Sequence, residues 1–374
     1  MPCACELASF TGWYDCWDPF PVAPVLGLLP GVPLFGTEPM KFTRRAAAAA
    51  LALFMSTAAT VAPAFGFEPA IVFDMGGRFD KSFNEGANNG AERFKKDTGT
   101  NFRWFEVTNE AQREQFLRRL ASRNADIIVS VGFSMAPSVE KVAKEFPNVR
   151  FTLIDGKVDL PNVQSIEFAE HEGSYLVGVL AAMASKTGTV GFIGGMDIPL
   201  IRRFACGYEQ GVKATNPKAN VIANMAGSTP AAWADPTRGS ELAKSQFDRG
   251  ADVIFAAAGQ TGMGVLQAAS DAGKLSIGVD SNQNYLFPGK VLTSMVKRVD
   301  IAAYEAFKTA QDGTWKAGHR RLGLKEDGVG WAFDDNNKAL ITPAMKAAVD
   351  KATADIKSGA RTVANYDDAK GCKY

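Results

Sequence analysis

The fold is decided by two similar stretches, AIVFDMGGRFDKSFNEGANNG at residues 70–90 and VGFIGGMDIPLIRRFACGYEQG at residues 190–211. Each stretch begins with an apolar run, passes through two adjacent glycines, and then has a Phe followed by glycines three and seven positions later. An apolar run that ends at glycines is typical of a buried strand and a turn, and the later spacing is helical. The repetition predicts two similar α/β lobes.

The similarity between the two halves continues downstream. The matching features are ADII at residues 125–128 and ADVI at 251–254, Gly132 and Gly259, and Asp155 and Asp280. Short apolar runs alternate with helix-length segments along the chain, which predicts parallel sheets with crossover helices.

We therefore expect an α/β protein of two doubly wound parallel-sheet lobes joined by several chain crossings, with a hinged cleft between them. The expected division assigns residues 65–170 and 284–317 to lobe 1 and residues 171–283 and 318–374 to lobe 2.

An export signal is predicted before the first lobe. The chain has basic residues soon after Met40, then a short apolar run, then an Ala-x-Ala motif, as in a secretory signal peptide. The parts are Lys41, Arg44 and Arg45, residues 46–55, and Ala62-Pro63-Ala64. We expect residues 40–64 to be a cleavable signal peptide and residues 1–39 to precede the native start. The mature chain, from Phe65, is expected to be soluble, monomeric and periplasmic.

Cysteine placement gives two further expectations. No Cys follows the apolar run of the signal closely, so a lipid anchor is not indicated. Cys206 and Cys372 could pair in an oxidising compartment. Because Cys372 belongs to a polar tail, we favour the reading in which Cys206 is a small buried apolar side chain and the two stay apart.

The composition excludes several classes of protein. Lys+Arg of 41 and Asp+Glu of 40 give a net charge of +1, which does not favour nucleic acid or an anionic membrane surface as a partner. The two His residues argue against a His-rich metal site. We expect neither a metal nor a cofactor.

Ligands of open α/β sheets bind beyond the carboxyl ends of the strands, where the repeated motifs lie. Phe83 and Phe204 have equivalent places and could hold a flat ring between them, although a Phe in the first turn of a helix is commonly a core residue. Asp280 could accept hydrogen bonds from two neighbouring hydroxyls, and the amide of Asn84 could read a ring edge.

Four more residues complete the predicted site. Asp155 ends a strand in the first half as Asp280 does in the second, and Gly259 would let the backbone approach a ligand. Lys297 follows a strand and could reach a hydroxyl or a ring nitrogen, or could be a surface lysine. Trp233 could gate the cleft or could pack.

Two helix starts can be located from capping patterns. Ser82 and Glu85 have the spacing of a capping box, in which each side chain satisfies a backbone N–H of the helix that begins there. Asp235-Pro236 has an N-cap residue followed by proline at the first helical position.

Several longer motifs resemble one known family. They are GRFDKSFN at residues 77–84, GFIGGMDIP at 191–199 with Arg203-Phe204, ADVIFAAAG at 251–259, IGVDS at 277–281 and TSMVKRVD at 293–300. In this order, over residues 70–356, they resemble the basic membrane protein family of ABC-transporter substrate-binding proteins, whose characterised members include purine-nucleoside receptors.

The resemblance implies a type I periplasmic-binding fold and a protein that is not an enzyme. It implies stacking by Phe83 and Phe204, base contacts near Asn84, and ribose contacts from Asp280, Lys297 and the Gly259 loop. The implied function is capture of a purine nucleoside or a free purine base by lobe closure, followed by docking on an ABC permease.

Two departures from the family pattern affect the ligand. The Gly132 loop continues as Ser134-Met135-Ala136-Pro137-Ser138 where nucleoside-binding members tend to have an acidic residue, and the Asp280 motif continues as Ser281-Asn282-Gln283 and not with a second Asp. A carboxylate that reads the base is therefore expected to be absent, and a free base is a conceivable ligand.

The alternatives are a sugar receptor of the same fold and, more distantly, a serine hydrolase. In the hydrolase reading Ser134 lies in a loosened nucleophile elbow, with His319 downstream. A sugar-responsive repressor is disfavoured by the export signal.

Overall fold

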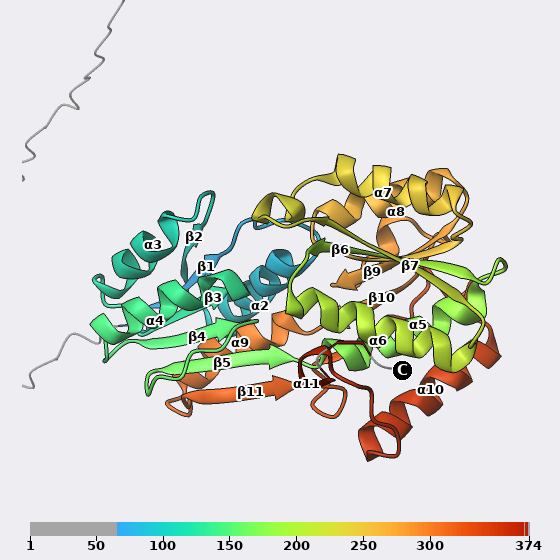
Figure 1. The fold of residues 1–374 in the computed structure, drawn as a ribbon. Helices are drawn as coiled ribbons and strands as arrows, with labels where there is room; N and C mark the ends of the chain where they lie inside the picture. The colour runs from blue at the N-terminus through green and yellow to red at the C-terminus, as the bar shows by residue number, and fades with distance from the viewer. Residues whose placement is uncertain (1–65, 370, 373–374) are drawn as a thin grey trace, which may run out of the picture. The chain divides into compact units, whose positions relative to one another are not determined.

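The computed structural model describes residues 66–369, 371 and 372, so the predicted signal peptide (40–64) and upstream segment (1–39) lie outside the described residues. The described residues belong to one structural unit that contains two α/β lobes (Figure 1). Each lobe has a six-stranded sheet with helices on both faces.

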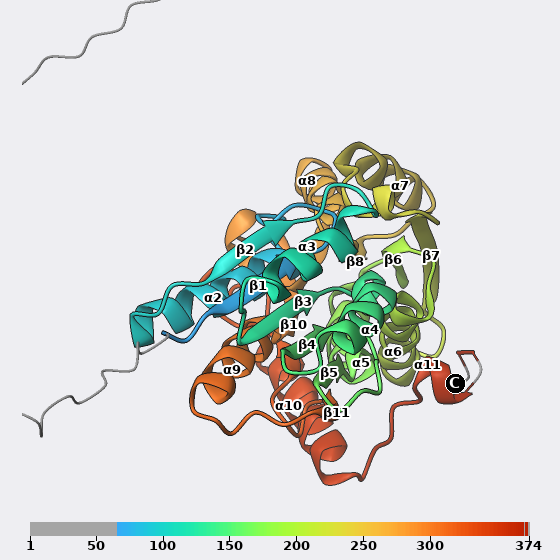
Figure 2. The same ribbon diagram turned by 90° about the vertical axis from the view of Figure 1, so that its left-hand side faces the viewer.

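Lobe 1 is built on a parallel sheet of order β11-β5-β4-β3-β1-β2. The strands are β1 (Pro69–Phe73), β2 (Arg103–Glu106), β3 (Ile127–Val131), β4 (Arg150–Ile154), β5 (Val163–Phe168) and β11 (Gly318–Leu322). Strand β1 is buried on both faces, because Ile71 packs toward the helices α2 (Phe83–Thr98) and α9 (Val299–Gln311). Val72 packs toward α3 (Gln112–Ala121) and α4 (Ala136–Glu145), which lie together over β3 and β4 (Figure 2).

Lobe 2 has the sheet order β12-β10-β9-β8-β6-β7, in which only β12 is antiparallel to its neighbour. The strands are β6 (Thr189–Met196), β7 (Asn220–Gly227), β8 (Val253–Ala257), β9 (Leu275–Asp280), β10 (Val291–Lys297) and β12 (Val329–Trp331). Helices α5 (Glu170–Ala184) and α6 (Pro199–Thr215) cover one face, and α7 (Pro236–Asp248) and α8 (Thr261–Asp271) cover the other.

The remaining helices are short or terminal. Single turns of 3-10 helix are η1 (Phe133–Met135), η2 (Pro230–Trp233) and η3 (Asn284–Leu286). Helix α10 (Pro343–Ser358) packs on α5, and α11 (Tyr366–Ala369) packs on α6. Within the described residues, none of the helices combines the length and the apolar character needed to cross a membrane.

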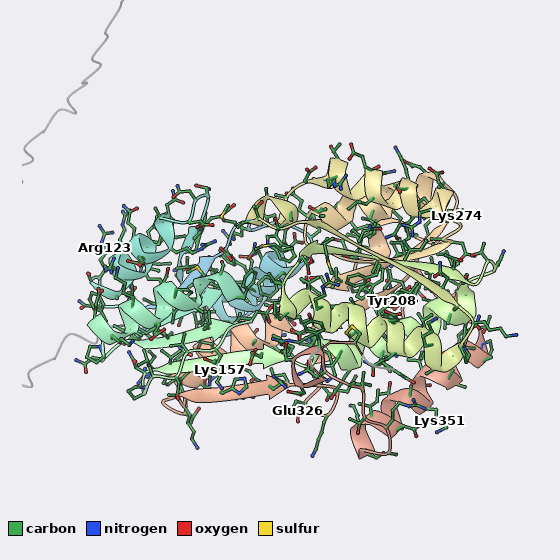
Figure 3. The ribbon with its side chains drawn as sticks, in the orientation of Figure 1. Arg123, Lys157, Tyr208, Lys274, Glu326 and Lys351 are labelled. Atoms are coloured by element: carbon green, nitrogen blue, oxygen red, sulfur yellow. A yellow bond between two sulfur atoms is a disulfide. The ribbon has the colours of Figure 1, made fainter. Side chains whose placement is uncertain are left out.

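The glycines of the repeated motif allow close helix packing. A Cβ on Gly207 or Gly211 of α6 would overlap the backbone carbonyls of His171 and Tyr175 on α5. Gly90 has the same role in α2, where a Cβ would overlap the carbonyl of Asp300 on α9. Tyr208, between the two glycines of α6, is fully buried in the interior of lobe 2 (Figure 3). Each motif therefore specifies a strand, a turn and a tightly packed helix pair.

The chain crosses between the lobes three times, between β5 and α5, between β10 and α9, and between β11 and β12. This differs from the expected division in two places. Strand β10 was assigned to lobe 1 with residues 284–317, but it pairs with β9 in the sheet of lobe 2. Strand β11 was assigned to lobe 2 with residues 318–374, but it pairs with β5 in lobe 1. Pairing partners of such short strands depend on distant residues, which local patterns do not contain.

The expectation that the two cysteines stay apart is wrong. Cys206 on α6 and Cys372 form a disulfide, with Cα atoms 5.2 Å apart. The tail that carries Cys372 follows α11, which packs on α6. A polar composition did not indicate this contact.

Candidate functional site

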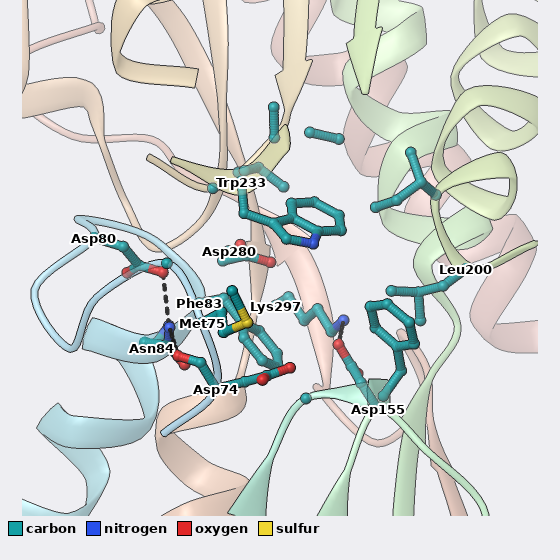
Figure 4. Close-up of a pocket in the computed structure, with 18 of the residues that line it drawn as sticks. Asp74, Met75, Asp80, Phe83, Asn84, Asp155, Leu200, Trp233, Asp280 and Lys297 are labelled. Carbon is teal, nitrogen blue, oxygen red and sulfur yellow. Dashed lines mark hydrogen bonds and ion pairs between the residues drawn. The ribbon is translucent and has the colours of Figure 1, made fainter. Parts of the chain in front are cut away.

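A pocket lies between the lobes, at the carboxyl ends of strands from both sheets (Figure 4). Its empty volume is about 640 Å³, including the part that opens to solvent. All eight residues of the predicted site line it: Phe83, Asn84, Asp155, Phe204, Trp233, Gly259, Asp280 and Lys297. Lining residues that the sequence analysis did not select include Asp74, Met75, Asp80, Phe133, Leu200 and Ile201.

The rings of the two predicted aromatic residues, Phe83 and Phe204, both lie close to the ammonium group of Lys297. The ammonium of Lys297 lies 5.2 Å from the ring centroid of Phe83 and 5.5 Å from that of Phe204. Phe83 begins α2 and is partly exposed. Phe204 is only 2 % exposed, because its ring also packs against Phe255 of the lobe core. The pocket thus has one open aromatic wall and one that is largely embedded.

A buried chain of charges crosses the floor of the pocket. The ammonium of Lys297 lies 2.5 Å from Asp155 Oδ2 and 3.1 Å from Glu170 Oε1. Burial raises the pKa of Asp155 to about 7, although Lys297 favours the ionised form. The two carboxylates outweigh burial at Lys297 and raise its pKa, so the lysine stays charged. Among the described residues, Asp155 Oδ1 has no hydrogen-bond partner, which leaves one acceptor for a ligand.

Asp155 and Asp280 have the same uncommon backbone conformation. Their φ angles are 67° and 61°, in the left-handed region that few residues other than glycine adopt. Asp155 directly follows β4 of lobe 1, and Asp280 is the last residue of β9 of lobe 2. Asp280 Oδ2 accepts a hydrogen bond of 2.5 Å from the hydroxyl of Ser82, across the lobe boundary. Burial raises the pKa of Asp280, and Lys297 opposes this rise.

The amide of Asn84 has a defined orientation. Its Nδ2 donates to the backbone carbonyls of Asp74 and Gly77, both at 3.2 Å. Because carbonyls can only accept, the Oδ1 atom must lie on the other side, where it is buried without a partner in the described part of the chain. The donor groups of Asn84 are therefore used by the protein, and its free capacity is that of an acceptor.

The capping box predicted for the start of α2 is wrong. Asp80 caps the helix instead, because its carboxylate accepts from the backbone N–H groups of Ser82, Asn84 and Glu85 at 2.9–3.0 Å. A carboxylate is favoured at a helix N-terminus by the helix dipole. The hydroxyl of Ser82 is thereby released to bond Asp280 in the other lobe.

A carboxylate does line the pocket close to the Gly132 loop. The hydroxyl of Ser134 bonds Asp74, which follows β1, and Arg113 Nε donates to the other carboxylate oxygen at 3.3 Å. The acidic group that is missing from the loop itself is thus present on the neighbouring strand end. A sequence signal for Asp74 was its place at the end of the first strand.

The hydrolase arrangement is not formed. Ser134 is bonded to Asp74, whereas His319 Nε2 lies 2.6 Å from Glu167 Oε2 at the edge of lobe 1. No imidazole lines the pocket that contains Asp74. Among residues 66–369, 371 and 372, His, Cys, Asp and Glu side chains form no cluster that could hold a metal ion.

Trp233 closes one side of the pocket. It lies on η2 of lobe 2, and its indole occupies space that a Cβ on Gly195 would need. A Cβ on Gly259 would meet the same side chain, and one on Gly76 of lobe 1 would lie 3.7 Å from the Cβ of Trp233. In Figure 4 the indole lies across the pocket from Asp74 and Asp155. Gly195 is thus the glycine that makes room for the indole, and Gly76 and Gly259 lie next to the same residue.

This architecture can be compared with known proteins. A family model described as "ABC transporter substrate-binding protein PnrA-like", Bmp, matches residues 67–361. The chain belongs to the Bmp family. The predicted family is therefore confirmed, and the protein is a substrate-binding protein of an ABC transporter rather than an enzyme.

Relatives of the Bmp protein include two with informative names. The chain is 39 % identical over 279 residues to an uncharacterised lipoprotein of Pyrococcus horikoshii, covering 71 % of this chain and 69 % of that one. It is 32 % identical over 317 residues to the ABC transporter nucleoside-binding protein BmpA of Lactococcus lactis subsp. cremoris, covering 79 % and 88 %.

A solved structure supports the fold. The ABC transporter solute-binding protein of Aeropyrum pernix K1 aligns with a TM-score of 0.74 and 29 % identity, over 80 % of this chain and 93 % of that one. The expected type I periplasmic-binding fold is thereby confirmed.

Proposed function

We propose that this Bmp protein captures a purine nucleoside or a free purine base between its lobes and delivers it to a membrane permease. The observation that carries the proposal is the composition of the interlobe pocket. It combines the rings of Phe83 and Phe204 with buried acceptor atoms of Asn84 and Asp155 that have no hydrogen-bond partner among the described residues. A flat heterocycle with N–H donors, with or without ribose hydroxyls, matches this set. The name of the Lactococcus relative gives independent support.

The charges of the pocket favour an uncharged ligand. Four carboxyl groups line it, those of Asp74, Asp80, Asp155 and Asp280, against one ammonium, that of Lys297. The ammonium is already paired with Asp155 and Glu170. Burial raises the pKa of Asp80 and of Asp155 to about 7, so these carboxyl groups are only partly ionised near neutral pH. A phosphate group would still find no unpaired ammonium among the described lining residues, and a buried charge without a partner is costly.

Apolar wall residues argue against the sugar alternative. Met75, Phe133, Leu200 and Ile201 supply much of the lining. These side chains suit a planar ring, whereas a sugar would leave several hydroxyls without partners on this side of the pocket.

Lobe closure is the proposed mechanism of capture. Three hydrogen bonds of 3.0 Å or less join the start of α2 in lobe 1 to the end of β9 and the residues after it in lobe 2. They are Ser82 Oγ to Asp280 Oδ2 at 2.5 Å, Ser281 Oγ to the carbonyl of Ser82 at 3.0 Å, and Gln283 Nε2 to the carbonyl of Lys81 at 2.9 Å. A ligand that contacts both lobes would stabilise this closed arrangement.

The cellular location follows from the same proposal. We infer that the chain acts outside the cytoplasmic membrane, where it meets the permease. The lipoprotein name of the Pyrococcus relative counts against the expectation of an unanchored mature chain.

Matched aromatic variants test the pocket. Phe83→Ala and Phe204→Ala should each weaken adenosine binding by about 1–3 kcal/mol, the scale of base–aromatic stacking. Phe79→Ala is the control, because Phe79 is 64 % exposed and does not line the pocket. Calorimetric titration after unfolding and oxidative refolding, which removes carried-over ligand, provides the affinities. Wild-type affinity in both pocket variants would refute stacking.

A further inference from the structure

One face of α6 is bound to the C-terminal end of the chain. Three residues of this helix, at spacing i, i+3 and i+7, each hold a residue of the tail, and this spacing places them on one side. We name residues 363–369 together with Cys372 the C-terminal strap. The contacts are Gln210 with Ala364 through hydrogen bonds of 2.9 and 2.8 Å, Cys206 with Cys372 through the disulfide, and Arg203 with Asp367 through an ion pair of 2.8 Å.

Arg203 joins the strap to both lobes. Its guanidinium is largely buried and lies 3.2 Å from Glu167 Oε1 on β5 of lobe 1 and 3.2 Å from Glu170 Oε2 at the first lobe crossing. Asp367 of the strap is its third carboxylate partner. Burial raises the pKa of Glu167, but Arg203 and His319 outweigh it and hold that pKa below its usual value. Arg203 thus organises carboxylates from three separate parts of the fold.

The same carboxylates lead into the pocket. Glu170 is fully buried, and it also contacts Lys297 at 3.1 Å. Lys297 in turn holds Asp155 at 2.5 Å, with both side chains in the pocket wall. Arg203 is also the sequence neighbour of Phe204, whose ring borders the pocket. A movement of Arg203 would therefore displace both Phe204 in the pocket wall and, through Glu170, the Lys297–Asp155 ion pair.

We propose that Arg203 and Asp367 are positioning residues of the ligand pocket, and that the C-terminal strap belongs to the binding apparatus. Asp367 fixes the guanidinium from the outside, and the guanidinium fixes Glu170 and the first turns of α6. The role of Arg203 and Asp367 in ligand affinity rests on the proposed function, whereas their role in ordering the pocket does not depend on it. Asp367 is exposed, whereas Arg203 and Glu170 are buried. Removing the Asp367 carboxylate leaves the buried guanidinium less compensated, so side chains must rearrange or take up water.

Adjacent carboxylates of the strap provide a matched test. Asp367→Asn should weaken adenosine binding about 3- to 20-fold, the range of changes along coupled networks. Asp368→Asn is the control, because Asp368 Oδ2 accepts a hydrogen bond of 3.2 Å from Asn365 within the strap and Arg203 pairs with Asp367 instead. Equal affinities in Asp367→Asn, Asp368→Asn and wild type would overturn the proposal.

Variants of Arg203 separate positioning from a general loss of structure. In Arg203→Gln the lost positive charge raises the pKa of Glu167, so the weakening of adenosine binding on acidification should begin at higher pH than in wild type. Arg203→Lys retains the charge and should restore the wild-type pH profile in part. Affinity that falls by the same factor at every pH in both variants would contradict the assigned role.

A ligand-free measurement keeps the inference independent of the proposed function. Hydrogen–deuterium exchange should show faster exchange in Asp367→Asn at the first turns of α6 and at the end of β10, with Asp368→Asn unchanged. If the wild-type protein binds no nucleoside or base, the proposed function fails. The exchange measurement alone then tests whether the C-terminal strap orders the pocket. Unaltered exchange at both segments would refute the structural coupling.

Discussion

At the residue scale, a few polar atoms decide what the pocket can hold. Asn84 Oδ1 and Asp155 Oδ1 are acceptors without partners in the described residues, and Asp280 is held by a serine of the opposite lobe. The residue types were predictable from the sequence. Which of their acceptor atoms are left without a hydrogen bond was not predictable, because the side-chain orientation of Asn84 depends on carbonyls from the loop before α2.

The role of Asp280 can be tested by separating sugar from base. Asp280→Asn keeps the size of the side chain but removes the charge that would accept ribose hydroxyls. Adenosine binding should weaken by about 1.5–3 kcal/mol, the range for hydrogen bonds to charged groups, while adenine binding stays close to wild type. Calorimetry with both ligands checks this, and adenine is the internal control. Equal losses would mean that Asp280 does not contact ribose.

His171 gives a prediction about stability and pH. Burial lowers its pKa from 6.5 to about 4 in the folded protein. The unfolded chain binds a proton at higher pH than the folded one, so this contribution to stability is complete above pH 6.5 and is lost as the pH falls toward 4. Between pH 7 and pH 5 the loss should be about 2 kcal/mol.

The measurement is the free energy of unfolding by urea at several pH values. His171→Gln cannot be protonated and should lose the His171 part of this pH dependence. Parallel pH curves for wild type and variant would contradict the assignment.

At the element scale, the repeated glycines have a packing role that the sequence analysis did not assign. Among the glycines, the sequence analysis assigned a role only to Gly259, as a position where the backbone approaches a ligand. That reading suits Gly259, which lines the pocket with φ of 56°. Gly90, Gly207 and Gly211 instead lie where two helix backbones meet.

Two glycines of α2 offer a matched comparison. A Cβ on Gly90 would overlap the carbonyl of Asp300, whereas a Cβ on Gly86 would make ordinary contacts at 3.7 Å. Gly90→Ala should destabilise the fold by about 1–3 kcal/mol through overpacking. Gly86→Ala should be neutral or stabilising by up to about 1 kcal/mol, because Ala has the higher helix propensity. Urea unfolding measures both, and the opposite order would refute the packing account.

The elements themselves were largely predictable, and their partners were not. The alternation of strands and helices and the Asp235 cap of α7 agree with the structure, where Asp235 Oδ1 accepts from the backbone N–H of Arg238. The cap of α2 was assigned to Ser82 and Glu85 because the local pattern does not show that Ser82 bonds the other lobe. The lobes of β10 and β11 were exchanged for a similar reason, since each strand directly precedes a crossing.

At the scale of the whole described unit, polar contacts tie the three crossings to the ligand pocket. Glu170 lies at the first crossing and Lys297 at the second, and they are in contact. The second and third crossings are joined by the backbone N–H of Arg298, which donates to the carbonyl of Gly328 at 2.8 Å. A ligand near Lys297 would therefore act on the segments that join the lobes, as the proposed capture by lobe closure requires.

The measurement that tests the central claim most directly is calorimetric titration of the chain from residue 65, after unfolding and oxidative refolding. The ligands are adenosine, guanosine, inosine, adenine, hypoxanthine, uridine and ribose. The account predicts saturable binding of at least one purine nucleoside or base at a single site, and no comparable binding of ribose alone. Binding of ribose with no response to any purine would contradict it and would favour a sugar receptor of the same fold.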